Sequence, residues 1–254
     1  MILTHWLLTL VFAQLWMMLA WLMYRHVGNP MIADVAWGFG IMLLSWLHVL
    51  FFSFDRYHFI ALVMVSCWGL RLSAYLYWTR LRQHWHDKRY QALEERSHNL
   101  FINYQIQGFL QSIIAIPWFF IGASHIGLCF YLGSLIFFIG FFIECLADFQ
   151  LKNFKKNHPQ QLCNQGLWQY SRHPNYFGEI LIWIGFAILG LSSPWGVLGA
   201  ISPIGLILLM RFITGPLTEE TSIQSRGKAY LDYQKSTPMI APDLKKYLLS
   251  HFVS

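Results

Sequence analysis

The stretch that decides the fold runs from Ile2 to Tyr24 and reads ILTHWLLTLVFAQLWMMLAWLMY. It contains no Lys, Arg, Asp or Glu, and it exceeds the roughly 20 residues that a helix needs to cross a bilayer. It is too long for the apolar part of a secretory signal peptide, and no basic region precedes it. We therefore expect a first transmembrane helix and no cleaved leader.

The rest of the chain continues this pattern. Of the 254 residues of the whole chain, 56% are hydrophobic and only 12% are charged, against about 25% charged in an ordinary soluble domain. Too few charges remain to cover a water-facing surface, which excludes a disordered chain, a coiled coil and a typical soluble globule. The apolar runs are continuous and do not alternate, so they favour membrane helices over a transmembrane β-barrel.

Six further apolar runs follow the first, which predicts an all-α integral membrane protein with about seven transmembrane helices. The predicted spans are Ile2–Tyr24, Asp34–Phe54, His58–Thr79, Gly108–Ser124, Leu128–Ala147, Tyr176–Leu191 and Trp195–Thr214. Pro117 interrupts the fourth run, which transmembrane helices tolerate. We expect residues 1–254 to form a single membrane domain.

Lys and Arg are distributed very unevenly along these spans. With the N-terminus placed outside, all but two of the 18 basic residues fall on the cytosolic side; Arg56 is outside, and Arg71 lies within a span. This asymmetry follows the positive-inside rule and predicts a cytosolic C-terminus. The formal net charge of +6 therefore reflects topology. Since no basic stripe stands apart from the apolar runs, we expect no nucleic-acid partner.

Five ionisable side chains fall within or at the edge of the predicted spans, where each needs a partner or a function. They are Asp34, Arg71, Glu144, Asp148 and Glu179. Asp34 opens a span and is either an interfacial carboxylate favoured by the helix dipole or part of a site. Glu144 and Asp148 are four residues apart and share a helix face that continues to Lys152. That face is either an ordinary helix end or the wall of a cytosol-facing pocket.

The densest group of polar side chains lies in the motif Gly166–Glu179, which reads GLWQYSRHPNYFGE. Pro174 suits the first turn of a helix, which places Arg172 and His173 just before a helix N-terminus. Free backbone N–H groups, the helix dipole and a guanidinium group would meet there, which is typical of a phosphate site. The alternative is an interfacial helix cap with Tyr and Arg anchors.

Two pairs of residues three positions apart support a pocket at this point. Tyr176 and Glu179 share one face of the helix that follows Pro174, and Tyr230 and Tyr233 share a face in the C-terminal segment. On its own, the C-terminal segment reads as an interfacial amphipathic helix. On the same side of the membrane as the motif, it could close a pocket over a nucleotide.

Several familiar signatures are absent. No GxGxxG motif opens a βαβ unit and no P-loop occurs, so the standard soluble nucleotide-binding folds are excluded. No HExxH motif and no zinc-type Cys spacing occurs, and we expect no metal site.

The motif resembles the C-terminal signature of membrane steroid and sterol reductases. The steroid 5-alpha-reductase family carries Asn-Tyr-Phe-Gly-Glu, matched here by Asn175 to Glu179, and sterol reductases carry Arg-His-x-Asn-Tyr-x-Gly-acid, which begins here at Arg172. The whole chain resembles the bacterial DUF1295 branch of these proteins, best over residues 137–242. The resemblance implies a seven-helix fold in a bacterial inner membrane, with NADPH in a cytosol-facing cavity of the C-terminal part. It also implies reduction of a carbon–carbon double bond conjugated to a ketone.

The residues and the resemblance together predict a cofactor site made of Glu144, Asp148, Lys152, Arg172, His173, Asn175, Tyr176, Glu179, Tyr230 and Tyr233. Tyr77, which precedes an aromatic residue and Arg80, is similar to the family's catalytic Tyr. The family pairs that Tyr with a Glu on the preceding helix, and no Glu occurs before Tyr77 here. Asp34 is predicted to take its place, and residues 1–130 to line the substrate.

The implied chemistry is hydride delivery to the β-carbon of a lipid-like enone, while a Tyr and a carboxylate stabilise the enolate. A membrane methyltransferase of the isoprenylcysteine or phospholipid type, which binds S-adenosylmethionine, is the alternative. Such enzymes share Arg-His-Pro-x-Tyr-x-Gly, here Arg172 to Gly178, and a Glu-Glu pair, here Glu219 and Glu220. Asn175 and Glu179 favour the reductase. A non-catalytic lipid-binding membrane protein is the third hypothesis. The substrate and the choice between NADPH and NADH stay open.

Overall fold

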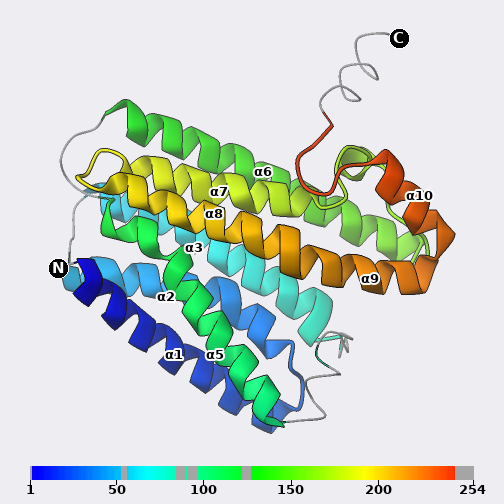
Figure 1. Ribbon diagram of the computed structural model, residues 1–254, viewed down its shortest axis with the longest axis horizontal. Coiled ribbons are helices and arrows are strands. Elements are labelled where there is room, and N and C mark those ends of the chain that lie inside the picture. The colour runs from blue at the N-terminus through cyan, green and yellow to red at the C-terminus, as the bar shows by residue number, and fades with distance from the viewer. Residues whose placement is uncertain (1, 53–55, 84–89, 91–96, 122–126, 244–254) are drawn as a thin grey trace. The chain divides into compact units, whose positions relative to one another are not determined.

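The computed structural model describes residues 2–52, 56–83, 90, 97–121 and 127–243. Over these ranges all regular structure is helical, as predicted (Figure 1). The elements are α1 (Ile2–Val27), α2 (Ile32–Phe52), α3 (Arg56–Leu76), η1 (Tyr77–Leu81), α5 (Ser97–Ile114), η2 (Ile116–Phe119), α6 (Leu128–Asn157), η3 (Gly166–Gln169), α7 (Pro174–Gly190), η4 (Gly196–Ala200), α8 (Ile201–Leu209), η5 (Met210–Thr214), α9 (Gly215–Arg226) and α10 (Lys228–Ser236).

Within the described residues, five helical stretches are long and apolar enough to cross a membrane. They are Ile2–Val27, Ile32–Phe51, Arg56–Leu81, Leu128–Asn157 and Gly196–Arg226. Large apolar side chains are exposed along them, including Leu3 and Leu15 on α1 and Phe138 and Phe142 on α6. A helix that exposes such residues along its length is suited to lipid and not to water. The chain is therefore a multi-pass membrane protein.

The two remaining predicted spans are shorter or displaced. The apolar helix α7 has 17 residues. Helix α5 begins at Ser97, well before the predicted start at Gly108, and ends at Ile114. The chain then turns through η2 at Pro117, because a proline ring cannot continue the ladder of helix hydrogen bonds. The predicted ends at Phe54 and Ser124 lie outside the described residues, and a count of seven spans stays a prediction.

The helices divide into two compact units. The first unit comprises Met1–Leu132 and Phe186–Ser202. In it α2 packs against α3, and α1 packs against α2 and α5. The contact between α2 and α3 is close, since a Cβ added to Gly69 would lie 2.7 Å from the carbonyl oxygen of Gly38. The indole of Trp16 ties α1 to α2 through a 2.9 Å hydrogen bond to the carbonyl of Ala36.

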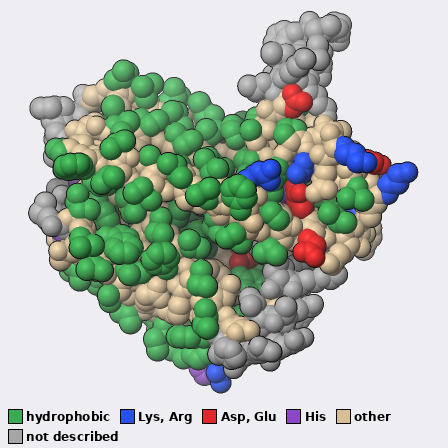
Figure 2. Space-filling view, in the orientation of Figure 1, with side chains coloured by type: hydrophobic (Ala, Val, Ile, Leu, Met, Phe, Trp, Pro, Cys, Tyr) green, Lys and Arg blue, Asp and Glu red, His purple; other side chains and the backbone are tan. Residues whose placement is uncertain are grey.

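The second unit comprises Gly133–Gly185 and Pro203–Ser254. Its helices α6 and α7 run antiparallel, because Gly185 on α7 faces Gly133 on α6 and Gly178 faces Gly140. Most of the charged side chains visible in Figure 2 gather over α9 and α10, whereas the visible surface of α6, α7 and α8 is largely hydrophobic. The second unit thus has an apolar part and a polar end, and the motif of residues 166–179 lies at the polar end.

Candidate functional site

The motif Gly166–Glu179 is anchored to the polar end of α6. The side-chain oxygen Oε1 of Gln150 accepts a 2.9 Å hydrogen bond from the backbone N–H of Leu167. The buried indole of Trp168 donates a 3.0 Å hydrogen bond to the carbonyl of Ala147. These two contacts fix η3 and thereby determine where α7 begins.

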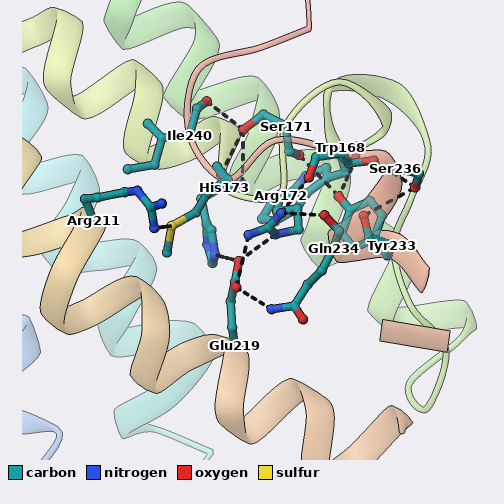
Figure 3. Close-up of polar contacts among 12 residues, drawn as sticks. Trp168, Ser171, Arg172, His173, Arg211, Glu219, Tyr233, Gln234, Ser236 and Ile240 are labelled. Carbon is teal, nitrogen blue, oxygen red and sulfur yellow. Dashed lines mark hydrogen bonds and ion pairs between the residues drawn. The ribbon is translucent and has the colours of Figure 1, made fainter. Parts of the chain in front are cut away.

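A buried carboxylate, that of Glu219 on α9, collects the polar side chains of this region (Figure 3). Its Oε1 lies 2.7 Å from Nε of Arg172 and 3.0 Å from Nε2 of His173. Its Oε2 lies 3.1 Å from Nη2 of Arg172 and 2.7 Å from Nε2 of Gln234. The Arg172–Glu219 pair is therefore a two-pronged ion pair, the geometry that a guanidinium forms best with a carboxylate.

The start of α7 is covered by the chain's own C-terminal segment. The backbone N–H groups of Arg172 and His173 donate to the carbonyls of Pro238 and Met239, at 2.9 and 3.0 Å. Nη1 of Arg172 also donates to the carbonyl of Thr237 at 2.5 Å. The segment after α10 is thus held across the helix N-terminus by backbone and side-chain donors together.

The two tyrosines of α10 close the same region. The hydroxyl of Tyr233 donates to the carbonyl of Trp168, and the carbonyl of Ser171 lies 3.2 Å from it. Burial raises the pKa of Tyr233 above its usual range. Burial, and then the negative charge of Glu219, raises the pKa of Tyr230. Both phenols therefore stay neutral at physiological pH and act as hydrogen-bond donors.

The predicted acidic face of α6 lies beside the start of α7. Glu144 and Asp148 are buried, and a Cβ added to Gly178 would lie 2.7 Å from the backbone nitrogen of Glu144. Oδ1 of Asn175 is buried and has no hydrogen-bond partner among the described residues. Lys152 is exposed one turn beyond Asp148. Buried acceptors of this kind fit the hydroxyl and amino donors of a nucleotide, so the residues present fit a dinucleotide cofactor.

Two further predicted site residues lie on the first turns of α7. The ring of His173 stacks on that of Tyr176, with centroids 4.7 Å apart and planes 11° from parallel. Glu179 is half-buried one turn further on. All ten residues predicted to bind the cofactor belong to the second unit. Their roles in cofactor binding stay predictions.

Glu219 and Gln234 were not among the residues predicted from the sequence to form this cluster. Glu219 is followed by Glu220 in the chain, yet Glu219 is buried and Glu220 is exposed. Nothing in the local sequence separates these two carboxylates, since both occupy a polar helix. The only available signal was the Glu-Glu pair shared with membrane methyltransferases.

A second polar cluster belongs to the first unit and is centred on Asp34. Its Oδ2 lies 2.6 Å from Nη1 of Arg80, and its Oδ1 accepts a 2.7 Å hydrogen bond from the hydroxyl of Tyr90. The amide of Gln107 lies 3.3 Å from the same hydroxyl. Arg80 belongs to η1, a short π-helical turn, and such turns occur often at functional sites. Asp34 is thus more than a helix-end carboxylate, because it holds a buried phenol.

The predicted catalytic residues, Tyr77 and Asp34, are not joined in this cluster. Tyr77 is 43% exposed, its ring contacts that of Trp78, and among the described residues it makes no hydrogen bond to Asp34. The phenol that Asp34 holds is that of Tyr90, which was not among the predicted site residues. The catalytic assignment of Tyr77 stays a prediction, and Tyr90 is the alternative that the geometry offers.

The described part of the chain contains no group of three or more His, Cys, Asp or Glu residues that could hold a metal ion.

A family model described as "Protein of unknown function (DUF1295)" matches residues 20–237. The chain is also similar to 3-oxo-5-alpha-steroid 4-dehydrogenase 1 of Rattus norvegicus, with 28% identity over 116 residues, or 45% of this chain and 41% of the relative. The protein of the same name from Mus musculus is 31% identical over 75 residues, or 29% of this chain and 28% of the relative. These matches span less than half the length of either relative. No solved structure matches the chain.

Proposed function

Because the chain belongs to the DUF1295 family, and its curated relatives are named as steroid dehydrogenases, we propose that it is a membrane-embedded, NADPH-dependent reductase. Its substrate would be a lipid-like or steroid-like enone, reduced at the conjugated carbon–carbon double bond. The observation that carries this proposal is the Asn175–Glu179 motif, seated against the buried Glu144 of α6, with the buried Asp148 one turn further along that helix.

The second unit would hold the cofactor. Glu144 and Asp148 would accept hydrogen bonds from sugar hydroxyl or amino groups, and Oδ1 of Asn175 would accept one more. The exposed Lys152 would favour a 2′-phosphate, and thus NADPH over NADH. The neutral phenols of Tyr230 and Tyr233 would close the site. NADPH, when bound, supplies a hydride.

The first unit would supply the acid. A phenol next to a carboxylate can donate a hydrogen bond, and then a proton, to a substrate carbonyl as negative charge develops on it. Asp34 would orient that phenol, which is Tyr77 by resemblance and Tyr90 by geometry. Residues 1–130 would also provide the apolar lining for the substrate.

The topology forms part of the same proposal. We propose seven spans in a bacterial inner membrane, with the N-terminus outside and both the C-terminus and the cofactor site facing the cytosol. The positive-inside distribution of Lys and Arg supports this orientation. A cytosol-facing site is required because NADPH is a charged, water-soluble cofactor.

The test is nucleotide binding by the purified full-length protein in detergent, with NADPH, NADH and S-adenosylmethionine titrated by calorimetry. We expect saturable binding of NADPH, and its oxidation when a 3-oxo-4-ene steroid or a polyprenyl enone is added. The Asp148→Ala variant should lose most of the affinity for NADPH. Asp232→Ala is the matched control, because Asp232 is exposed on α10 and pairs only with Lys235 there.

The membrane methyltransferase remains the second candidate for one specific reason. Glu219 contacts both Arg172 and His173, which unites the Arg-His-Pro motif and the Glu-Glu pair that these enzymes share. Binding of S-adenosylmethionine in place of NADPH would decide for this alternative. A folded protein that binds neither would leave the non-catalytic lipid binder as the better reading.

A further inference from the structure

Arg172 has few N–H donors left with which to bind a ligand. A guanidinium carries five N–H donors. Nε and one Nη2 donor go to Glu219, and the two Nη1 donors go to the carbonyls of Gln234 and Thr237. The side chain is only 11% exposed. Four of its five donors are thus already used inside the protein.

The backbone donors beside it are used as well. The N–H groups of Arg172 and His173 donate to the carbonyls of Pro238 and Met239. Pro174, the first residue of α7, has no N–H group. Neither of these two N–H groups is therefore open to a phosphate, because the C-terminal segment occupies both.

We infer that Arg172 is a positioning residue, which fastens residues 234–240 across the start of α7, and that it is not a ligand of the cofactor's phosphates. This inference rests on the proposed function only where it concerns the cofactor. In this arrangement the carboxylate of Glu219 can only accept hydrogen bonds, so Nε2 of His173 must carry a proton. In the neutral ring, Nδ1 is then the acceptor that His173 offers.

The buried charge of Glu219 gives the first test, which needs no cofactor. Arg172→Ala leaves a buried carboxylate without its cation, which is strongly destabilising, whereas Arg172→Ala combined with Glu219→Gln removes the charge together with its partner. We expect the loss of thermal stability in the double variant to be much smaller than the sum of the losses in Arg172→Ala and in Glu219→Gln measured separately. Additive losses would overturn the inference. Arg226→Ala is the control, because Arg226 makes only long, exposed hydrogen bonds.

Hydrogen exchange locates the effect within the chain. In Arg172→Lys, which keeps the charge but loses the planar fork, we expect faster exchange of the amides of residues 172 and 173, because residues 237–239 are no longer held. Exchange at wild-type rates in this variant would contradict a fastening role. This variant also serves as the main probe if Arg172→Ala does not fold.

The second test separates the two roles of Arg172 through the ratio of Kd values for NADH and NADPH. A positioning residue affects both nucleotides equally, so we expect the ratio to be unchanged in Arg172→Lys and Arg172→Ala. A phosphate ligand would instead lower the NADPH affinity selectively, by tenfold or more in Arg172→Ala, and Lys would largely restore it. Lys152→Ala is the positive control, because the loss of a cation that pairs with the 2′-phosphate should shift the ratio.

The proposed cofactor and the inference about Arg172 can fail independently of each other. A wild-type protein that binds neither nucleotide overturns the proposed cofactor, while the stability cycle still decides the fastening role. Selective loss of NADPH binding in Arg172→Ala overturns the inference and leaves the proposed reductase standing.

Discussion

Gly140 on α6 and Gly178 on α7 bring their two backbones into direct contact. A Cβ added to Gly140 would lie 2.6 Å from the carbonyl oxygen of Gly178, and a Cβ added to Gly178 would lie 2.7 Å from that of Gly140. Small residues allow this approach between membrane helices, where lipid gives no hydrophobic drive for association. The contact lies one turn from Glu144 and one turn from Asn175, so it sets the geometry of the proposed cofactor site.

Replacing either glycine should therefore damage both stability and the site. We expect Gly178→Ala to cost about 1–3 kcal/mol, the usual range for an overpacked contact, because backbone atoms cannot yield. Thermal unfolding in detergent measures this loss. Gly127→Ala is the control, since a Cβ there would meet no atom of the described residues within 4 Å. Equal stability of the two variants would show that the helices tolerate separation.

We expect Asn175 to contribute to the affinity for NADPH but not to the stability of the fold. Its buried Oδ1 has no hydrogen-bond partner among the described residues, so Asn175→Leu removes an unsatisfied polar group and should leave the melting temperature unchanged or higher. The same change removes an acceptor from the cofactor and should raise the Kd for NADPH by about fivefold, since one hydrogen bond contributes about 1 kcal/mol. Calorimetry and thermal unfolding on the same samples test the pair of outcomes. A marked loss of stability with normal affinity would assign Asn175 to the structure alone.

Tyr90 and Tyr77 should behave differently when each loses its hydroxyl. Tyr90→Phe breaks a buried hydrogen bond to the Asp34 carboxylate, and bonds to charged groups contribute about 1.5–3 kcal/mol. Tyr77→Phe should stay within about 0.5 kcal/mol of the wild type, because Tyr77 is exposed. Once a reducible enone is found, the variant with the larger fall in kcat identifies the acid. A loss in Tyr77→Phe alone would restore the assignment made by resemblance.

The attachment of α10 should fail at high pH. Burial raises the pKa of Tyr233 in the folded protein above the unfolded value of about 10, so folding favours the neutral phenol. This contribution is complete below about pH 10 and is lost as the pH rises towards the folded pKa. Thermal unfolding between pH 8 and 11 should show a decline that is reduced in Tyr233→Phe and retained in Tyr77→Phe. An identical decline in all three proteins would place the titration elsewhere.

Parts of the site could be predicted because local spacing carries them. Glu144 and Asp148 share a face at i and i+4, and Pro174 marks a helix start; both features appear in the structure. Tyr90 could not be selected, because its partner Asp34 is 56 positions away and no periodicity connects them. The role of Arg172 was equally hidden, since a guanidinium beside a helix start attracts a phosphate or a carboxylate with the same chemistry.

The sequence by itself determined that this is a helical membrane protein. Long uncharged segments are stable in the lipid bilayer, where they must satisfy their backbone hydrogen bonds internally. It also determined where the polar chemistry lies, since charges are costly in lipid and concentrate where they are used. Only the tertiary structure decided which charge meets which. Glu219 and not Glu220 is buried against Arg172, and Tyr90 and not Tyr77 lies against Asp34. Such pairings depend on how distant segments pack, and that packing is not encoded in the spacing of neighbouring residues.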